Sequence, residues 1–261
     1  MHRDEIANQI IEKLNSSESS LRALWASSGH KYFYIDDLLP EPLVEMIRHS
    51  FPSKDLMRVR HSLREQKYVA AQMDRFNPIL EEVVYAFQAQ GVREVISKIT
   101  CINHLLPDER LYAGGISMMS KGHLDNSHNN DRSLYRALNL LFYVSPDWQI
   151  NHGGHLELWD DLKNSTTIQS QCNRLVVMAT NKSSWYSVSK VKVNSDCCCI
   201  SSYFFTKEPP ESDHYFHITS FRGRPGQPIR SAVLRCDSIV RTGIRKIFPR
   251  GLVKTKHIYV K

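Results

Sequence analysis

Residues 138–159 read LNLLFYVSPDWQINHGGHLELW and contain two apolar runs that are separated by turn-forming residues. The first run, 138–145, is rich in leucine and aromatic residues, which are common in extended strands. The second run, 155–159, places leucine at every other position, the period of a strand with one buried face. Pro146, Gly153 and Gly154 bound the connection, because Pro and Gly interrupt regular structure. The stretch therefore predicts two short strands.

The same pattern extends from about residue 111 to residue 205, where short β-rich runs alternate with turn clusters. A series of strands at this spacing, without helices between them, indicates an antiparallel sandwich or barrel. The runs that we expect to form strands are 111–119, 138–145, 153–160, 166–169, 173–180, 183–193 and 197–205.

The N-terminal part has helical character, because its apolar residues recur at helical spacing. One strand is expected there at 31–36, and the chain returns to helix at 238–247. The sequence thus predicts an α+β protein with a helical layer on a β core. The expected N-terminal helices are 5–14, 21–26, 40–48, 79–89 and 92–99.

Composition limits the class of protein. With 261 residues, 41% of them apolar, the chain can bury a sizeable core. The net charge of +7 is concentrated near the C-terminus without a nucleic-acid motif, so nucleic acid is not the expected partner. No run reaches the roughly 20 apolar residues of a membrane helix, and the start lacks the apolar core of a secretory signal. We therefore expect a cytoplasmic protein whose six cysteines stay reduced.

His123 and Asp125 form a His-x-Asp pair within GHLDNSHNNDR, residues 122–132. Residues two apart on an extended strand point to the same face, so an imidazole and a carboxylate could share one cation. With 12 histidines in the chain, such a pair is close to what chance supplies, and a polar surface turn is the alternative interpretation.

The order of the segments after this pair is more specific. LNLLFYVSPDW, GGHLELWD, NRLVVMAT, SWYSVSKV and SSYFF follow in turn. This succession resembles the prolyl-4-hydroxylase-like branch of the Fe(II)/2-oxoglutarate-dependent oxygenases, over roughly residues 30–225. The resemblance implies a double-stranded β-helix (jelly-roll, cupin-like) core with a helical N-terminal layer. We expect a helical extension at 1–30, the oxygenase-like domain at 31–225 and a basic C-terminal segment at 226–261.

The resemblance also implies a site. In this family two His and one carboxylate hold Fe(II), and a cation, best an Arg, binds the far carboxylate of 2-oxoglutarate. His123 and Asp125 match the first two ligands. Asn139 and Tyr143, which share one face of the following strand, and Cys199 are expected in the wall of the cofactor pocket.

The chain departs from the family pattern at two positions. Tyr186 occupies the third-ligand position, where the family has the His of Ser-x-His-x-Val. The cation position, 10 or 11 residues later, falls on Asp196 or Cys197. Losing one hydrogen bond to a charged group costs about 1.5–3 kcal/mol, so the missing Arg counts against 2-oxoglutarate as a cofactor.

Four interpretations stay open at this point. Tyr186 ligates the metal as a phenolate, which favours Fe(III) over Fe(II). Alternatively, His155, His128, Cys197 or Cys199 replaces the missing ligand. The site could instead be lost, leaving a catalytically silent binding or scaffold protein, or a different reaction could run in the same pocket without 2-oxoglutarate.

The expectation drawn from these residues is an oxidoreductase of the dioxygenase type with an altered active site and Fe(II) as its metal. It would hydroxylate a small molecule or a polypeptide side chain. Substrate choice in such a fold is set by variable loops, so the sequence names neither the substrate nor an oligomeric state.

Overall fold

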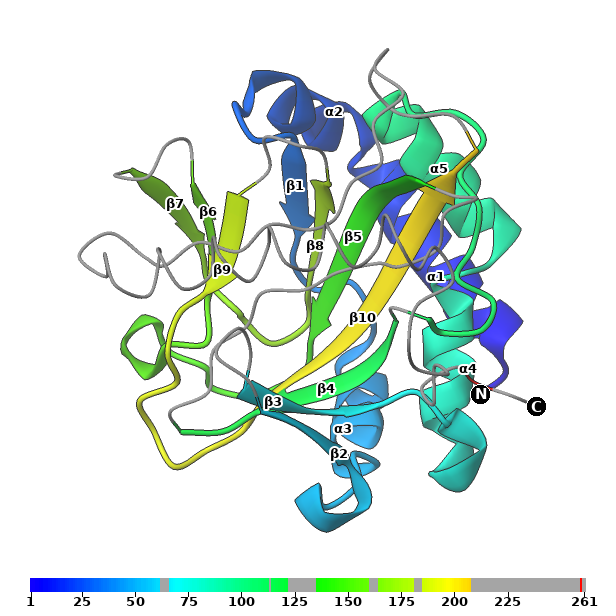
Figure 1. Cartoon of the computed structure of the whole chain (residues 1–261). Coiled ribbons are helices and arrows are strands. Elements are labelled where there is room, and N and C mark those ends of the chain that lie inside the picture. Colours follow the sequence, from blue (N-terminus) through cyan, green and yellow to red (C-terminus); the bar gives the residue numbers. More distant parts are fainter. Residues whose placement is uncertain are drawn as a thin grey trace, which may run out of the picture.

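The computed structural model describes residues 1–61, 66–112, 114–121, 135–159, 164–180, 185–207 and 259. Helices cover one side of a large sheet, and a small sheet lies on its other side (Figure 1). The helices are α1 (Arg3–Ser16), α2 (Glu18–Ser27), α3 (Glu41–His49), α4 (Pro78–Ala86) and α5 (Gln90–Thr100), with 3-10 turns η1 (Lys54–Leu56), η2 (Met73–Arg75) and η3 (Ile150–His152). The strands are β1 (Tyr32–Ile35), β2 (Arg58–His61), β3 (Gln66–Ala70), β4 (Gly115–Met119), β5 (Tyr135–Tyr143), β6 (Leu156–Trp159), β7 (Ser165–Ile168), β8 (Arg174–Ala179), β9 (Trp185–Val188) and β10 (Cys197–Thr206).

Both sheets are antiparallel throughout their described strands. The seven-stranded sheet has the order β1-β8-β5-β10-β4-β3-β2, and the three-stranded sheet has the order β7-β6-β9. One apolar cluster contains residues of both sheets, so the two sheets face each other. This arrangement confirms the expected α+β class and the jelly-roll core with its N-terminal helices.

The main core lies between the helices and the large sheet. Alternation along β5 turns Leu138, Leu140 and Phe142 toward the helices, and all three are buried there. The rings of Phe142 and Phe87, just after α4, lie 5.5 Å apart. Burying a side chain of this size stabilises the fold by about 1.5–3 kcal/mol, so this layer holds the large sheet rigidly.

Local sequence signals explain where the covering helices begin. At α4, the side chain of Asn77 accepts a hydrogen bond from the backbone N–H of Ile79 (3.1 Å), and Pro78 takes the first helical position. At α1, His2 and Glu5 form a reciprocal capping box.

The strands differ from the sequence expectation in length and number. Leu111 has φ +46° and Gly115 has φ +121°, so β4 begins only at Gly115, not at 111. A Cβ on Gly115 would lie 2.4 Å from the carbonyl oxygen of Ala70, so β3 approaches too closely for any other residue. The run expected at 183–193 forms the shorter β9, and the helix expected at 79–89 ends at Ala86.

Two strands were not expected at all. β2 and β3 pair with each other and extend the large sheet beyond β4. Their sequences, RVRH and QKYVA, are polar, because one of their faces carries cationic side chains. The helix expected at 238–247 lies outside the described residues. In the described part of the chain, no helix has the length and apolar character needed to cross a bilayer.

Candidate functional site

The space between the two sheets holds a second apolar cluster, here called the intersheet cluster. It is the space in which the sequence predicts the metal and its co-substrate. Leu156 and Leu158 of β6 face Val176 and Met178 of β8 across it. The buried members of the intersheet cluster are Met119, Tyr143, Trp148, Leu156, Leu158, Ile168, Val176, Met178, Val191, Cys197 and Cys199.

Tyr186, at the third-ligand position, lies on the face of β9 that is turned toward the large sheet. It pairs with Leu158 across β6 and β9, and its half-buried side chain packs against the intersheet cluster. The adjacent Ser187 points the other way, where its hydroxyl donates to Glu157 Oε2 (2.6 Å) and accepts from Trp159 Nε1 (2.9 Å). Strand alternation therefore aims the Tyr186 ring at the interior of the jelly roll.

The two other expected ligands, His123 and Asp125, lie outside the described residues, as does the alternative ligand His128. In the part of the chain that the structure describes, no three His, Cys, Asp or Glu side chains gather as a metal site. A metal centre opposite Tyr186 therefore depends on His123 and Asp125.

Cys197 is the first residue of β10, at the expected cation position, and is only 4% exposed. Its Sγ lies 4.0 Å from the carbonyl oxygen of Gly154, and a Cβ added to Gly154 would stand 3.5 Å from that sulfur. Burial raises the pKa of the thiol well above its usual value, and the neighbouring Cys199 and Cys198 raise it further. The group is therefore an uncharged thiol at neutral pH, in apolar surroundings.

Asp196, the other possible cation position, is acidic and already engaged. Lys54 Nζ lies 2.9 Å from its carboxylate, and Ser120 Oγ donates to it over 2.7 Å. On β8, Arg174 binds Asp36 through two hydrogen bonds, one of them 2.8 Å long, and lies over the ring of Tyr34.

These residues do not fit 2-oxoglutarate at its expected anchor. The far carboxylate of that molecule needs a cationic partner when it leaves water, since an unpaired buried charge is strongly unfavourable. Cys197 supplies a neutral thiol and Asp196 a like charge. The structure thus disagrees with the ordinary anchoring of 2-oxoglutarate in this jelly roll.

Asn139, Tyr143 and Cys199 are placed on the interior face of the central strands. Tyr143 pairs with Cys199 across β5 and β10, and both belong to the intersheet cluster. Asn139 is 1% exposed, and its Oδ1 has no hydrogen-bond partner in the described part of the chain. A buried acceptor without a partner costs about 1–3 kcal/mol, so this position suits a donor from a bound polar molecule or a water.

His155 has a structural role. Its Nδ1 accepts from the backbone N–H of Ser170 (3.1 Å), so its Nε2 carries the proton and donates to the carbonyl oxygen of Ile150 (2.9 Å). Burial lowers its pKa, which keeps the ring neutral. Because both nitrogens are used, His155 does not replace the missing metal ligand.

The glycine pair before β6 allows the loop after β9 to approach closely. Gly153 has φ +74°, and a Cβ there would lie 2.0 Å from the carbonyl oxygen of Lys190. The loop after β9 is held there by hydrogen bonds from Gly154 N to Ser189 O (3.1 Å) and from Lys192 N to His152 O (2.8 Å). The close approach of these two segments brings Gly154 against Cys197.

Arg136, near the start of β5, is a residue that the sequence reading did not single out. Its guanidinium Cζ lies 4.2 Å from the centroid of the Tyr203 ring on β10. Its Nε and Nη2 are buried and have no hydrogen-bond partner among the described residues. The available signal was a cation inside an otherwise apolar strand, YRALNLLFY.

Comparisons with known proteins agree with this geometry. Residues 110–205 match the family model described as the 2OG-Fe(II) oxygenase superfamily. A prolyl-4-hydroxylase from Pseudomonas putida has a similar structure, with a TM-score of 0.51 and 13% identity, covering 70% of this chain and 97% of that one. Comparison of the sequence with curated proteins gave no significant match.

Two further solved structures share the fold at a TM-score of 0.51. One is an oxidoreductase of the 2OG-Fe(II) oxygenase family from Burkholderia pseudomallei, with 10% identity, covering 73% of this chain and 90% of that one. The other is the non-haem α-ketoglutarate-dependent carbocyclase SnoK from nogalamycin biosynthesis, with 11% identity, covering 71% of this chain and 83% of that one. At such low identity these structures establish the fold alone. Residues 110–205 therefore belong to the 2OG-Fe(II) oxygenase superfamily, and the fold around them is that of its prolyl-4-hydroxylase-like members.

Proposed function

We propose that this chain is a divergent non-haem iron oxygenase-like protein that hydroxylates a small-molecule or polypeptide substrate at an atypical metal site. The site would consist of His123, Asp125 and Tyr186. The observation that carries the proposal is the direction of Tyr186, which projects from β9 into the jelly-roll interior although its neighbour Ser187 points outward.

The donor set accounts for the atypical character. A phenol has a pKa near 10 and must lose its proton to bind a metal, so the metal competes with that proton. One imidazole, one carboxylate and one phenolate form a harder set than two imidazoles and a carboxylate, and they favour the ferric ion. An iron ion held there would supply the redox centre for attack on a C–H bond.

The role of this chain's own residues is to shape the interior. Asn139 offers an acceptor at the centre of β5, and Tyr143 and Cys199 form the adjacent wall. The apolar surroundings lower the effective dielectric constant of this space, which strengthens polar contacts made inside it. Because Cys197 leaves the usual 2-oxoglutarate anchor without charge, we assign that molecule no step. Hydroxylation by dioxygen would then take two electrons from the substrate C–H bond and two from a separate reductant, and the second oxygen atom would leave as water.

A second candidate function is a catalytically silent binding protein on the same fold. One specific observation favours it: the cation position is filled by a neutral, almost fully buried thiol. Without the anchoring charge, the jelly roll would stay stable but would no longer bind 2-oxoglutarate in the ordinary way.

An anaerobic titration with Fe(II), followed by exposure to oxygen, separates the two candidates. We expect one iron per chain and, in the ferric form, a visible phenolate-to-iron absorption band. Tyr186→Phe keeps the ring and removes the donor, so it should abolish the band, whereas Tyr34→Phe on β1 should leave it unchanged.

Unchanged iron binding and an unchanged spectrum in Tyr186→Phe would contradict the proposed ligation. If the native chain binds no iron and Tyr186→His combined with Cys197→Arg restores binding of iron and 2-oxoglutarate, the silent binding protein is the correct description.

A further inference from the structure

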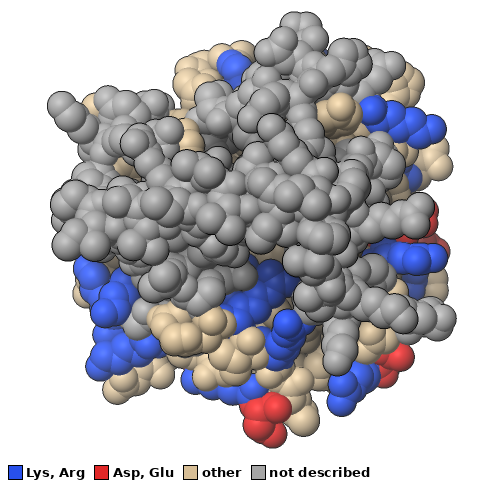
Figure 2. All heavy atoms as spheres, in the orientation of Figure 1, with Lys and Arg blue, Asp and Glu red and all other residues tan. Residues whose placement is uncertain are grey.

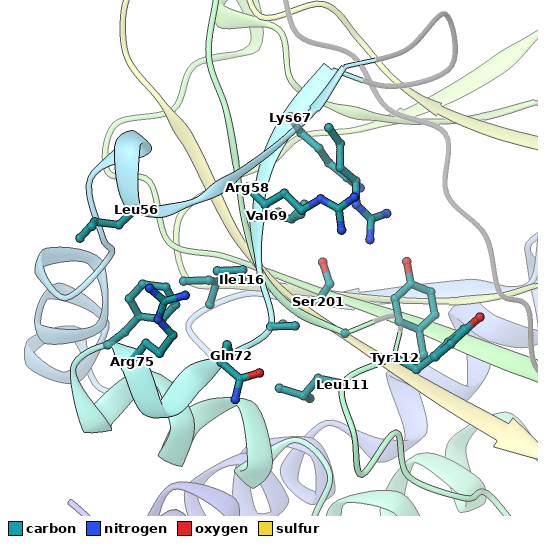
Figure 3. A pocket seen from close by; sticks show the side chains of 18 residues that line it. Leu56, Arg58, Lys67, Val69, Gln72, Arg75, Leu111, Tyr112, Ile116 and Ser201 are labelled. Atoms are coloured by element: carbon teal, nitrogen blue, oxygen red, sulfur yellow. The ribbon is translucent and has the colours of Figure 1, made fainter. Parts of the chain in front are cut away.

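A basic pocket of about 290 Å³ lies beside the β2–β3 edge of the large sheet (Figure 3). Its wall carries four cationic side chains, and none of the described residues that line it is acidic. The four cations are Arg58, Arg60, Lys67 and Arg75.

The sheet register explains why these charges converge. Arg58 pairs with Val69 and Arg60 pairs with Lys67, so the cations of β2 and β3 lie on the same face of the sheet. Val69 pairs in turn with Ser117 on β4, and Ser117 pairs with Cys199 on β10. The basic pocket therefore opens on the same face that borders the proposed metal site.

The side chains in Figure 3 give the pocket two ends. Arg58 and Lys67 extend over the side that also holds Ser201 and Tyr112, whereas Arg75 lies on the other side with Gln72. In Figure 1, β2 and β3 lie in the lower part of the molecule. In the same orientation, Figure 2 shows cationic residues gathered on the lower part of the visible face. A hollow lined by charges of one sign raises the local concentration of ions of the opposite sign.

Burial strengthens the electrostatic interaction that the pocket can offer. Lys67 is only 9% exposed, which is unusual for a lysine. The effective dielectric constant around a buried ammonium is lower than in water, so its attraction for an anion is larger than that of a surface lysine.

Arg136 is not among the residues that line the pocket, but it contacts one of them. Its guanidinium stacks on Tyr203, and Tyr203 is part of the pocket wall. Two of its nitrogens, Nε and Nη2, are buried without a hydrogen-bond partner in the described part of the chain. A buried guanidinium needs acceptors, and a bound oxyanion is the ligand that supplies several at once.

We propose that this pocket binds a small molecule that carries at least two negative charges as phosphoryl or carboxylate groups. Guanidinium groups match both oxyanions through paired hydrogen bonds, and the hydroxyls of Ser201 and Tyr112 add polar contacts. The volume suits a compact ligand rather than a polymer. This binding does not depend on metal, so it stands or falls separately from the proposed function.

Titration calorimetry on the full, metal-free chain tests the site with two probes, pyrophosphate and citrate, each at constant ionic strength. We expect saturable binding of at least one. Arg58→Gln and Lys67→Met should each weaken it about tenfold to a hundredfold, the effect of losing a hydrogen bond to a charged group. Arg136→Gln should weaken it as well. Arg22→Gln on α2 removes the same charge far from the pocket and should leave the affinity unchanged.

The two probes distinguish the two sources of charge: preference for pyrophosphate assigns a phosphoryl ligand, and preference for citrate assigns a polycarboxylate. Arg58 is exposed, so its variants should fold, and Arg58→Lys should retain part of the affinity because it keeps the charge and loses the paired donors. The absence of saturable binding of both probes overturns the proposal. So does an equal loss of affinity in Arg22→Gln and Arg58→Gln.

Discussion

Replacing Cys197 by Arg tests whether position 197 can still accommodate the cation that would bind 2-oxoglutarate. The substitution introduces a cation at the first residue of β10, where the side chain is 4% exposed. The thiol it replaces lies 4.0 Å from the Gly154 carbonyl oxygen, and the remaining neighbours in the intersheet cluster are apolar. Among the described residues, the intersheet cluster offers a guanidinium at this position no carboxylate.

The magnitude follows from two costs. An uncompensated buried charge destabilises a protein by about 3–5 kcal/mol. Overpacking adds about 1–3 kcal/mol, because the thiol is almost fully buried and a longer side chain must displace its neighbours. Even the combined lower limit of about 4 kcal/mol corresponds to a fall in Tm of about 8–16 °C for a chain of this size.

The assay is thermal unfolding of Cys197→Arg with and without 2-oxoglutarate. The variant should unfold at lower temperature, and 2-oxoglutarate at about 100 times its Kd should restore about 2.7 kcal/mol, because its far carboxylate pairs with the new cation. The same concentration should not stabilise the native chain. Two controls isolate charge and site: Cys197→Met adds length without charge, and Cys101→Arg adds the same charge at an exposed cysteine.

One outcome refutes this reasoning. If Cys197→Arg unfolds at the native temperature without 2-oxoglutarate, the position already has space and an anionic partner. In that case the anchor site is intact apart from its missing cation, and apolar packing has not filled it.

Three further predictions concern the surroundings of this position. Gly153→Ala should lower the free energy of unfolding, measured by urea titration, by at least about 2 kcal/mol. The reason is that φ is +74° and the added Cβ would meet the Lys190 carbonyl oxygen. A change within about 0.5 kcal/mol would contradict the close approach. His155 has a folded-state pKa below its usual value because it is buried, so the unfolded state takes up the proton first as pH falls. Stability should therefore be full above about pH 6.5 and decrease below it, less steeply in His155→Asn, and equal slopes in urea titrations across pH would exclude this role. Alkylation followed by peptide mass spectrometry should modify the exposed Cys101 quickly and the buried Cys198 slowly, since burial raises the pKa of Cys198 to about 11; similar rates would show that β10 opens readily.

The sequence indicated much of the fold correctly because strand alternation is a local property. The run 138–145 is rich in leucine and aromatic residues, the leucines of 155–159 alternate at a period of two, and the two runs form β5 and β6. The polar strands β2 and β3 escaped notice, because one face of each carries cations instead of apolar residues. β3 pairs with β4 and β2 pairs with β3, and the β3–β4 pairing is a long-range contact that no local pattern contains.

The candidate site divides in the same way. The sequence by itself predicted that Tyr186 and Cys197 occupy the ligand and anchor positions, because the ordered motifs resemble those of the family. Only the tertiary structure decided what these residues meet: an interior-facing ring on β9, and a thiol enclosed by Gly154 and kept neutral by burial. It also brought the cations of β2 and β3 onto one face and laid Arg136 over Tyr203. Burial and charge convergence depend on which segments pack together, and antiparallel pairing across distant segments sets that packing.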